Sequence, residues 1–369
     1  MAIYIKKFNV ECFRGIHQLT VDHTNHVNII AGDNNCGKTS VLEAMLLLCN
    51  YADITDILIL AQNRGPILMG GTSLYECFIN LFPKNRDEML ICVNAEYKDD
   101  SVRFYLTGEQ KRVVLELENE SNKSKKKYEM YANSTIAVEA DAFIGEIQCD
   151  YGEHKERATI NFDEHISLDG RRIRRDKYIK MIYLAPFNHI FRNVFNRIIE
   201  DDSLKDICLN ALRLFDPDIQ DLLLLMSKEN NRPVEYVKHT KLGNMPLSTY
   251  GDGIKKVLSI ANGIAMAAGG VLLIDEVETA IHSRYYYDIF RFIVKACRQL
   301  KVQVFITSHS IEAIDGFLGT QDYDKQNDHD DIQVITLKKD SESGRTLSRV
   351  LPGRQVYANR EQFGFEVRL

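Results

Sequence analysis

Runs of apolar residues divide the N-terminal part of the chain into strands, a turn and a helix. Residues 2–10 alternate between apolar and polar positions and predict a strand, and residues 27–30 form a short apolar run that predicts another. Residues 38–50 are apolar on most faces, which predicts a buried helix. A turn that contains glycine joins the second strand to this helix. This strand–turn–helix unit is the first clear landmark of the chain.

The middle of the chain has a different pattern. Short segments there alternate between apolar and polar residues: 91–97, 102–106, 113–117 and 127–131. Charged turns separate these segments, as is typical of antiparallel hairpins. Residues 188–230 then look helical. The pair Asp216-Pro217 predicts the start of a helix over 216–226, because proline fits the first helical turn.

The C-terminal third returns to buried strands and helices. The pattern predicts strands at 234–238, 271–274 and 302–306, helices at 254–268 and 285–300, and a hairpin over 332–351 around residues 341–344. Short buried strands that alternate with helices favour a parallel sheet. Because antiparallel segments are also present, the sequence predicts a composite α/β protein. After the hairpin we expect only a tail.

Composition narrows the class of protein. The 369 residues include 46 Lys and Arg against 52 Asp and Glu, a formal net charge of −6, and 45% are hydrophobic. These values exclude a disordered chain, a collagen-like chain and a polycationic nucleic-acid coat. None of the eight cysteines forms a CxxC pair, and no secretory signal or membrane-spanning run is visible. We therefore expect a reduced, cytoplasmic protein without a membrane segment.

The turn after the second strand carries a phosphate-binding signature. Residues 32–39, GDNNCGKT, fit the pattern GxxxxGK[ST] between an apolar strand and a helix. Glycines let the backbone turn its N–H groups toward a phosphate, and the helix N-terminus faces the same anion. Lys38 is expected to reach the β- and γ-phosphates of ATP, and the Thr39 hydroxyl to bind Mg²⁺. The residues expected around the phosphates are Gly32, Asn34, Asn35, Cys36, Gly37, Lys38, Thr39 and Ser40.

Two carboxylates follow the buried strand at 271–274. Ligands of open α/β sheets bind at the carboxyl ends of the strands, where Asp275 and Glu276 stand. We expect Asp275 to hold Mg²⁺ through water and Glu276 to act as general base on the attacking water. Cys36 stands next to a helix N-terminus, which can lower the pKa of a thiol. The alternative is that Cys36 only fills space in the loop.

Three further segments support a family resemblance: Phe13-Arg14-Gly15-Ile16, the segment LSTYGDG at 247–253, and Thr307-Ser308-His309-Ser310. Their order around the phosphate loop resembles ATP-binding-cassette ATPases of the SMC, RecF and OLD kind. More closely, the chain is similar to stand-alone OLD-like ATPases of bacterial antiphage systems such as PARIS, Septu and retrons. The resemblance covers about residues 1–50 and 240–320. It implies a P-loop NTPase fold of the ATP-binding-cassette type with an antiparallel β subdomain and a helical insertion.

The resemblance also implies roles for individual residues. Arg14 would lie near the nucleotide, and Asn34 would position the γ-phosphate or the attacking water. Ser248 and Gly251 would bind the γ-phosphate of an ATP held by a partner subunit, in a homodimer or larger homo-oligomer. His309 would be the switch histidine that senses the γ-phosphate.

Two features depart from the family pattern or lack a diagnostic context. The usual LSGG reads LSTYGDG here, so the sequence supports a phosphate contact by Ser248 less strongly than one by Lys38. Gln62 is the candidate for the glutamine that links Mg²⁺ to lobe movement, but its surroundings, LAQNRG, are not diagnostic.

Basic clusters stand out in an acidic chain. Arg171, Arg172, Arg174 and Arg175 form one, and the lysine-rich segment 123–127 forms another. Such clusters neutralise phosphates along a nucleic acid, but solvated turns and surfaces for an acidic protein have the same composition.

The expected organisation is an ATPase head interrupted by an insertion. Residues 1–90 would carry the phosphate loop, 91–235 a β-rich and helical arm, and 236–369 the signature, the acidic strand and the switch histidine. Only 60 residues follow His309, too few for the nuclease domain of OLD proteins, so an effector, such as a nuclease, would be another chain. The resulting hypothesis is a dimerising ATPase that controls a separate effector in antiphage defence. Alternatives are a RecF/SMC-like DNA-repair ATPase and a scaffold that hardly hydrolyses ATP; a transporter ATPase is disfavoured.

Overall fold

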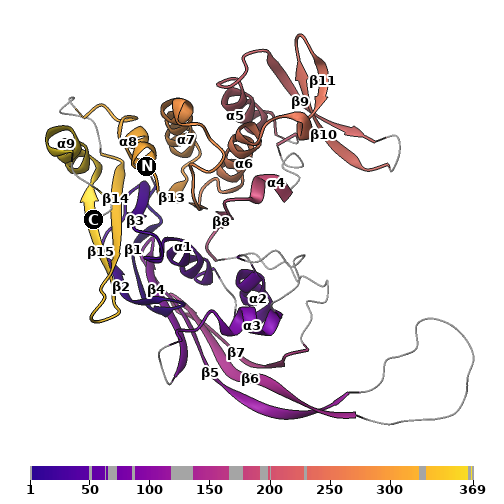
Figure 1. The fold of residues 1–369 in the computed structure, drawn as a ribbon, viewed down its shortest axis with the longest axis vertical. Coiled ribbons are helices and arrows are strands. Elements are labelled where there is room, and N and C mark those ends of the chain that lie inside the picture. Colours follow the sequence, from indigo (N-terminus) through magenta and orange to yellow (C-terminus); the bar gives the residue numbers. More distant parts are fainter. Residues whose placement is uncertain are drawn as a thin grey trace, which may run out of the picture.

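Three sheets organise the chain in the computed structural model (Figure 1). It describes residues 2–49, 52–62, 64, 73–84, 88–117, 136–165, 178–191, 198–199, 201–227, 231–323, 330–364 and 367. Residues 123–127, the arginines of the second basic cluster (Arg171, Arg172, Arg174 and Arg175) and the expected strand at 127–131 therefore lie outside the described residues.

The central sheet has the strand order β15-β14-β3-β13-β12-β8. Its strands are β3 (Val27–Gly32), β8 (Met181–Leu184), β12 (Val271–Ile274), β13 (Gln303–Thr307), β14 (Ile332–Lys339) and β15 (Thr346–Pro352). Neighbours pair in parallel except at the β14–β15 hairpin. Every residue of β3, β12 and β13 is buried, because both faces of the sheet are covered. The predicted buried strands and the C-terminal hairpin are thus confirmed.

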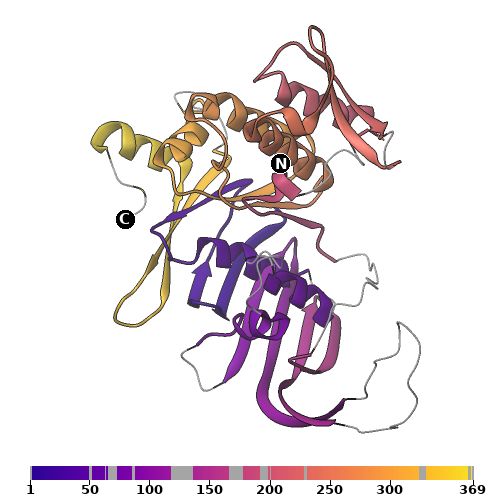
Figure 2. The ribbon, with the colours of Figure 1, turned by 45° about the vertical axis from the view of Figure 1, so that its right-hand side comes forward.

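Alternate residues of the central strands pack into two separate hydrophobic cores, one on each face of the sheet. Ile30, Leu273 and Phe305 belong to the core shared with the antiparallel sheet and helices α1 (Lys38–Leu47), α2 (Ile54–Gln62) and α3 (Leu74–Ile79). Ile29 and Leu272 belong to the core on the opposite face. The helices that cover that face include α5 (Asp202–Leu212), α6 (Asp252–Met266), α7 (Tyr286–Gln299) and α8 (Ile311–Leu318). Figure 2 shows the central sheet between these two layers.

The antiparallel sheet has the order β2-β1-β4-β5-β6-β7. Its strands are β1 (Ile5–Phe13), β2 (Ile16–Val21), β4 (Met89–Tyr97), β5 (Asp100–Leu117), β6 (Ile136–Tyr151) and β7 (His154–Asp163). The predicted hairpins are confirmed, although the two segments expected at 102–106 and 113–117 form the single strand β5. Because β1 pairs with β4, the N-terminal strand and the inserted β region share one sheet.

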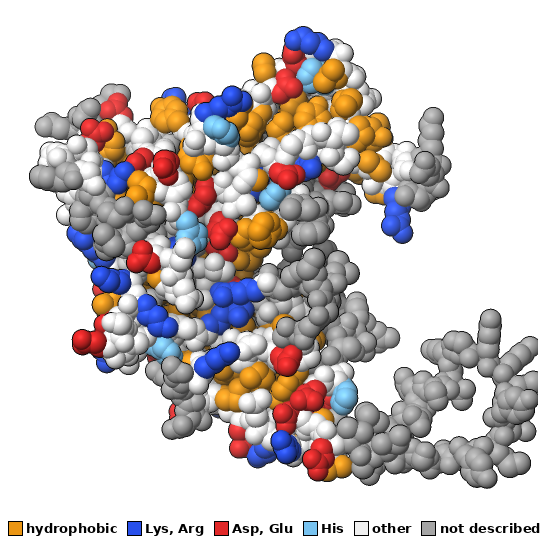
Figure 3. Space-filling view, in the orientation of Figure 1, with side chains coloured by type: hydrophobic (Ala, Val, Ile, Leu, Met, Phe, Trp, Pro, Cys, Tyr) orange, Lys and Arg blue, Asp and Glu red, His pale blue; other side chains and the backbone are white. Residues whose placement is uncertain are grey.

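The helix expected over 216–226 is wrong. Residues Ile219–Met226 form strand β9, which pairs antiparallel with β10 (Pro233–His239), and β10 pairs with β11 (Gly243–Pro246). A short run of leucines has no period that separates a strand from a buried helix, so pairing with β10 decides. Hydrophobic side chains gather on this lobe at the upper right of Figure 3. Leu225, Met226 and Leu242 are exposed there.

Two helices complete the fold. The short helix α4 (Asn188–Phe191) follows β8, and helix α9 (Gly353–Phe363) follows the C-terminal hairpin. The expectation of only a tail after the hairpin is therefore wrong. Helix α9 is held by Val356, buried in the second core, and by the ion pair of Arg360 with Asp315. In the described part of the chain, no helix has the length and apolar character needed to span a membrane.

Candidate active site

The loop between β3 and α1 has the backbone of a phosphate cradle. Gly32 and Gly37 have φ angles of 136° and 104°, and Asn35 has a φ angle of 63°, all in the left-handed region. A Cβ atom on Gly32 would lie 2.3 Å from the Leu337 carbonyl oxygen, so only glycine fits there. Gly37 directly precedes α1, whose first N–H groups have no partner within the helix. The loop and the helix N-terminus together form an anion-binding concavity.

Lys38 is folded back onto this loop. Its Nζ donates to the carbonyl oxygens of Gly32, at 2.7 Å, and Asp33, at 2.8 Å. Burial lowers the pKa of Lys38, and the charges of Cys36 and Asp33 act in the opposite direction. The ammonium group thus stands over the mouth of the cradle, where a phosphate oxygen could replace a carbonyl as its partner.

Asp275 lies at the centre of a cluster of hydroxyl groups. Its Oδ1 accepts hydrogen bonds from Thr39 Oγ1, at 3.1 Å, and Thr307 Oγ1, at 2.6 Å, and its Oδ2 from Tyr183 OH, at 3.2 Å. Asp275 is 2% exposed. Burial, followed by the nearby charge of Asp275, raises the pKa of Tyr183. A carboxylate and a threonine hydroxyl beside a phosphate cradle are the oxygen ligands that Mg²⁺ takes, so these residues fit that ion.

Glu276 is held in an unusual backbone conformation beside His309. Its φ angle is 47°, and its N–H donates to Thr307 Oγ1 at 2.8 Å. Its Oε1 lies 3.8 Å from His309 Nε2, and its Oε2 accepts from Thr279 Oγ1 at 3.2 Å. The two side chains are 37% and 38% exposed, so water can reach both. Strand ends β12 and β13 bring these residues together, as expected for carboxyl ends of neighbouring parallel strands.

Two charged residues of this region were missed by sequence reasoning. Glu278 Oε1 accepts from the His309 N–H at 2.6 Å and so ties the turn after β12 to the turn after β13. Lys256, on α6, is 2% exposed, and its Nζ donates to the carbonyl oxygens of Pro186, at 3.2 Å, and Glu276, at 3.4 Å. Burial lowers the pKa of Lys256 to about 8, against the attraction of Asp275 and the two glutamates. A lysine on the apolar face of a predicted helix is the signal that could have identified Lys256.

Arg14 is held beside α1 by a buried carboxylate. Glu43, with a fully buried side chain, lies 2.9 Å from Arg14 Nε. Glu43 also accepts from Arg64 Nη2 at 2.5 Å, and the same Nη2 donates to Ser40 Oγ at 2.8 Å. Burial lowers the pKa of Arg14, while the Glu43 charge opposes this shift. Arg14 thus reaches the helix of the phosphate loop, one turn beyond Thr39, and its contact with a nucleotide remains a prediction. Sequence reasoning missed Glu43 and Arg64.

The reactive thiol considered for Cys36 is wrong for this conformation. Cys36 is 5% exposed, and burial raises the pKa of its thiol, although the Lys38 charge lowers it. Burial thus outweighs the helix N-terminus. Cys36 Sγ lies 3.9 Å from Lys38 Nζ and fills the inside of the loop.

The other predicted residues lie at separate places around this site. Ser248, in a short 3₁₀ turn (Leu247–Thr249), and Gly251, which directly precedes α6, are exposed. Asn34 is exposed at the rim of the phosphate loop. Gln62 is the last residue of α2 and is half-buried. The structure alone therefore leaves the roles of these residues as predictions.

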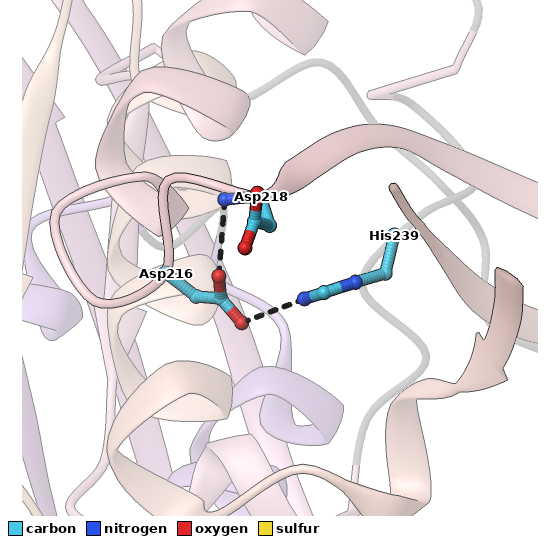
Figure 4. Close-up of side chains that lie close together, drawn as sticks. All are labelled: Asp216, Asp218 and His239. Atoms are coloured by element: carbon cyan, nitrogen blue, oxygen red, sulfur yellow. Dashed lines mark hydrogen bonds and ion pairs between the residues drawn. The ribbon is translucent and has the colours of Figure 1, made fainter. Parts of the chain in front are cut away.

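A second group of metal-ligating side chains lies away from the phosphate loop. Asp216, Asp218 and His239 converge between α5 and the β9–β11 sheet (Figure 4). His239 Nδ1 accepts the N–H groups of Lys241 and Leu242, both at 3.1 Å, so the ring proton is on Nε2 and is donated to Asp216 at 3.1 Å. Asp218 accepts from Thr240 and Lys241. These groups therefore fasten the turn before β9 to the end of β10 rather than offer free lone pairs to an ion.

The phosphate loop after β3, the carboxylates after β12 and the histidine after β13 define a P-loop ATPase of the ATP-binding-cassette type, with the fold of an SMC head. The sequence model of the family described as "AAA domain, putative AbiEii toxin, Type IV TA system" matches residues 27–315, and the chain belongs to this family.

Relatives and solved structures agree with this assignment. An "ATP/GTP phosphatase" of Helicobacter pylori is 22% identical over 389 aligned positions, which cover 98% of each chain. An uncharacterized protein of Methanocaldococcus jannaschii is 24% identical over 198 positions, 49% of this chain and 90% of that protein. An SMC head bound to the C-terminal winged-helix domain of ScpA superposes with a TM-score of 0.50 at 12% identity, covering 96% of this chain and 100% of that one. A Pyrococcus furiosus SMC head bound to the ScpA C-terminal domain also gives 0.50, at 10% identity, covering 98% and 100%.

Proposed function

We propose that this protein is a cytoplasmic, ATP-dependent dimerising ATPase that controls a separate effector in antiphage defence. The observation that carries the ATPase part is the meeting of four groups at one edge of the central sheet. Lys38 of the phosphate loop, Asp275, Glu276 and His309 come from three adjacent strand ends, and Asp275 contacts Thr39 directly. This arrangement would provide phosphate binding, a cation site and a base at one edge of the central sheet.

Each of these residues has its own role in ATP hydrolysis under this proposal. Lys38 exchanges the carbonyls of Gly32 and Asp33 for the β- and γ-phosphates. Thr39 and Asp275 hold Mg²⁺, which when bound neutralises charge on the phosphate oxygens. Glu276 accepts the proton of the attacking water, and His309, 3.8 Å away, stands where the γ-phosphate would be sensed.

The proposal that the protein dimerises rests on the family resemblance and on the exposure of Ser248 and Gly251. Ser248 and Gly251 are exposed at the start of α6, where a nucleotide held by a second chain could approach. An ATP bound from both sides favours the dimer by linkage, and hydrolysis releases it. Opening and closing of the two heads would pass the signal to the effector. Two SMC heads of similar fold were solved with domains of ScpA, so heads of this fold do carry partner proteins.

The ATPase part is tested with Glu276→Gln. The wild type should release phosphate from ATP, while Glu276→Gln should bind ATP and turn it over far more slowly because it cannot accept a proton. Hydrolysis by Glu276→Gln at the wild-type rate would show that another group is the base. Hydrolysis undetectable in the wild type and in its native complex would instead favour the scaffold hypothesis.

The dimer part is tested by mixing two inactive chains. Lys38→Ala removes the phosphate contact of one chain, and Ser248→Arg blocks the contact from the other. Mixed, they form dimers with one intact site, and partial recovery of ATP hydrolysis is expected. Ser341→Arg, in the exposed turn between β14 and β15, is the matched control and should be active alone. If Ser248→Arg is fully active alone, the second chain does not contribute Ser248.

The defence part is tested in cells. Co-purification from the native operon followed by mass spectrometry should identify an effector chain. Phage challenge of cells carrying the operon should show protection that is lost with Glu276→Gln. Retained protection with that variant would separate the defence role from ATP turnover.

A DNA-associated role of the RecF/SMC kind is the second candidate, favoured by the SMC-head fold. Reversal of the four arginines at 171, 172, 174 and 175 to glutamate should then abolish salt-sensitive binding to DNA or RNA. Equal binding by the reversed variant would mean that the cluster serves a protein partner or no ligand.

A further inference from the structure

Lys256 connects the helix that follows the signature segment to the residue proposed as general base. Its Nζ donates to the main-chain carbonyls of Pro186 and Glu276, at 3.2 and 3.4 Å. Pro186 follows β8 and Glu276 follows β12, and these strands are parallel neighbours that end side by side. One side chain of α6 therefore joins the ends of two strands at the proposed active edge of the sheet.

The burial of Lys256 marks this contact as more than surface packing. The residue is 2% exposed, and lysine is almost never buried to this extent unless its charge is used. Burying an ammonium group is costly, and the nearby carboxylates of Asp275, Glu276 and Glu278 compensate for that cost here. A neutral side chain of similar shape would leave these carboxylates without the positive charge of Lys256.

Glu276 is held on both sides of its Cα atom. Its N–H is bound by Thr307 Oγ1 and its carbonyl by Lys256 Nζ, while its φ angle of 47° is uncommon for a residue with a side chain. Such a conformation persists only when surrounding contacts enforce it. Loss of one contact would let the main chain relax and move the carboxylate of Glu276.

We propose that Lys256 is a positioning residue that fixes the main chain of Glu276 and links the first turns of α6 to ATP hydrolysis in the same chain. Gly251 directly precedes α6, and Lys256 stands about one turn inside it. A shift of this end of the helix, such as contact with a nucleotide of a second chain would cause, is transmitted through the lysine to Glu276. This inference rests on the proposed ATPase function.

The test compares Lys256→Met with Lys180→Met. Lys180 also donates to a main-chain carbonyl, that of Ala268 at 2.7 Å, at the opposite ends of the same helix and strand. Lys256→Met should lower kcat by about tenfold to a hundredfold, because small displacements of reacting groups have effects of that order. Its KM should stay within about threefold of wild type, since the phosphate loop is untouched. It should also accumulate an ATP-bound dimer, as expected for Glu276→Gln.

A conservative variant of Lys256 and a check of folding complete the experiment. Lys256→Arg keeps the charge and the donors and should retain more activity than Lys256→Met. If circular dichroism shows that Lys256→Met is not folded, the double variant Lys256→Met/Glu278→Gln, which removes the lysine charge together with a neighbouring carboxylate, is used in its place. Its kcat is compared with that of Glu278→Gln alone, because Glu278 also binds the His309 N–H.

The outcomes separate this inference from the proposed function. A folded variant without Lys256 whose kcat is within about twofold of wild type would overturn the positioning role. An equal loss in Lys180→Met would overturn it as well, because a generic packing defect would then explain both. If Glu276→Gln is as active as wild type, the proposed base is wrong, and the failure lies in the function rather than in Lys256.

Discussion

Thr307→Val isolates the contribution of one hydroxyl group to the candidate active site. Thr307 ends β13 and is fully buried. Its Oγ1 donates to Asp275 Oδ1 at 2.6 Å and accepts the N–H of Glu276 at 2.8 Å. Valine has almost the same shape and the same strand preference but has no hydroxyl. The substitution therefore removes both hydrogen bonds and leaves the packing almost unchanged.

The expected loss of stability follows from these two contacts. A hydrogen bond to a charged group contributes about 1.5–3 kcal/mol, and an N–H left without a partner costs about 1–3 kcal/mol when buried. The Glu276 N–H is only partly buried, so the combined effect should be about 2–5 kcal/mol. Thr336→Val is the matched control on β14: its hydroxyl is buried and makes one neutral hydrogen bond, to the carbonyl of Val367 at 2.8 Å. That single bond should contribute about 0.5–1.5 kcal/mol.

Urea denaturation and ATP turnover together test the expected changes in stability and in kcat. Thr307→Val should lower the free energy of unfolding by more than Thr336→Val does. Only Thr307→Val should also lower kcat, because loss of the Thr307 hydroxyl frees the turn that carries Glu276. Equal destabilisation by the two variants would refute the additional cost assigned to the charged partner. A wild-type kcat in folded Thr307→Val would refute the link between this hydroxyl and the position of Glu276.

Three further predictions concern binding, a buried ion pair and acid stability. Lys38→Ala should weaken ATP binding by about 10²-fold or more in calorimetric titration, because two charge-assisted contacts are lost; an unchanged Kd would contradict this. Glu43→Ala should lower the free energy of unfolding by about 3–5 kcal/mol, since it leaves the Arg14 guanidinium buried without its partner. Asp315→Ala, at an exposed ion pair, should cost only about 0–1 kcal/mol, and similar losses in both variants would disprove the distinction. Burial lowers the pKa of His26, so the unfolded chain binds its proton first and wild-type stability should fall as the pH drops below about 6.5. His26→Phe should lose part of this pH dependence in urea denaturation; an unaltered profile would rule out His26 as its source.

Local sequence signals were sufficient for the phosphate loop, for strands β3, β12 and β13 and for the C-terminal hairpin, but the edge strand β8 was not predicted. GDNNCGKT requires backbone conformations that few other residues permit, as the φ angles of Gly32 and Gly37 show, so the motif specifies its own structure. Strands β3, β12 and β13 are buried throughout because helices or a sheet cover both faces, and this burial is visible in the sequence as short, mostly hydrophobic runs. Asp275, Glu276 and His309 follow these strands directly, so their approach could be predicted without coordinates.

Tertiary contacts decided the features that depend on residues distant in the chain. Ile219–Met226 became a strand because β10 pairs with it, whereas the local preference of leucine favours a helix. The thiol of Cys36 has a raised pKa because the loop closes over it, which a position next to a helix N-terminus does not reveal. Lys256 reaches Glu276, 20 residues later, only because α6 packs across the ends of β8 and β12. Burial and long-range pairing are properties of the whole chain in three dimensions, and no local pattern encodes which carbonyl a buried lysine will meet.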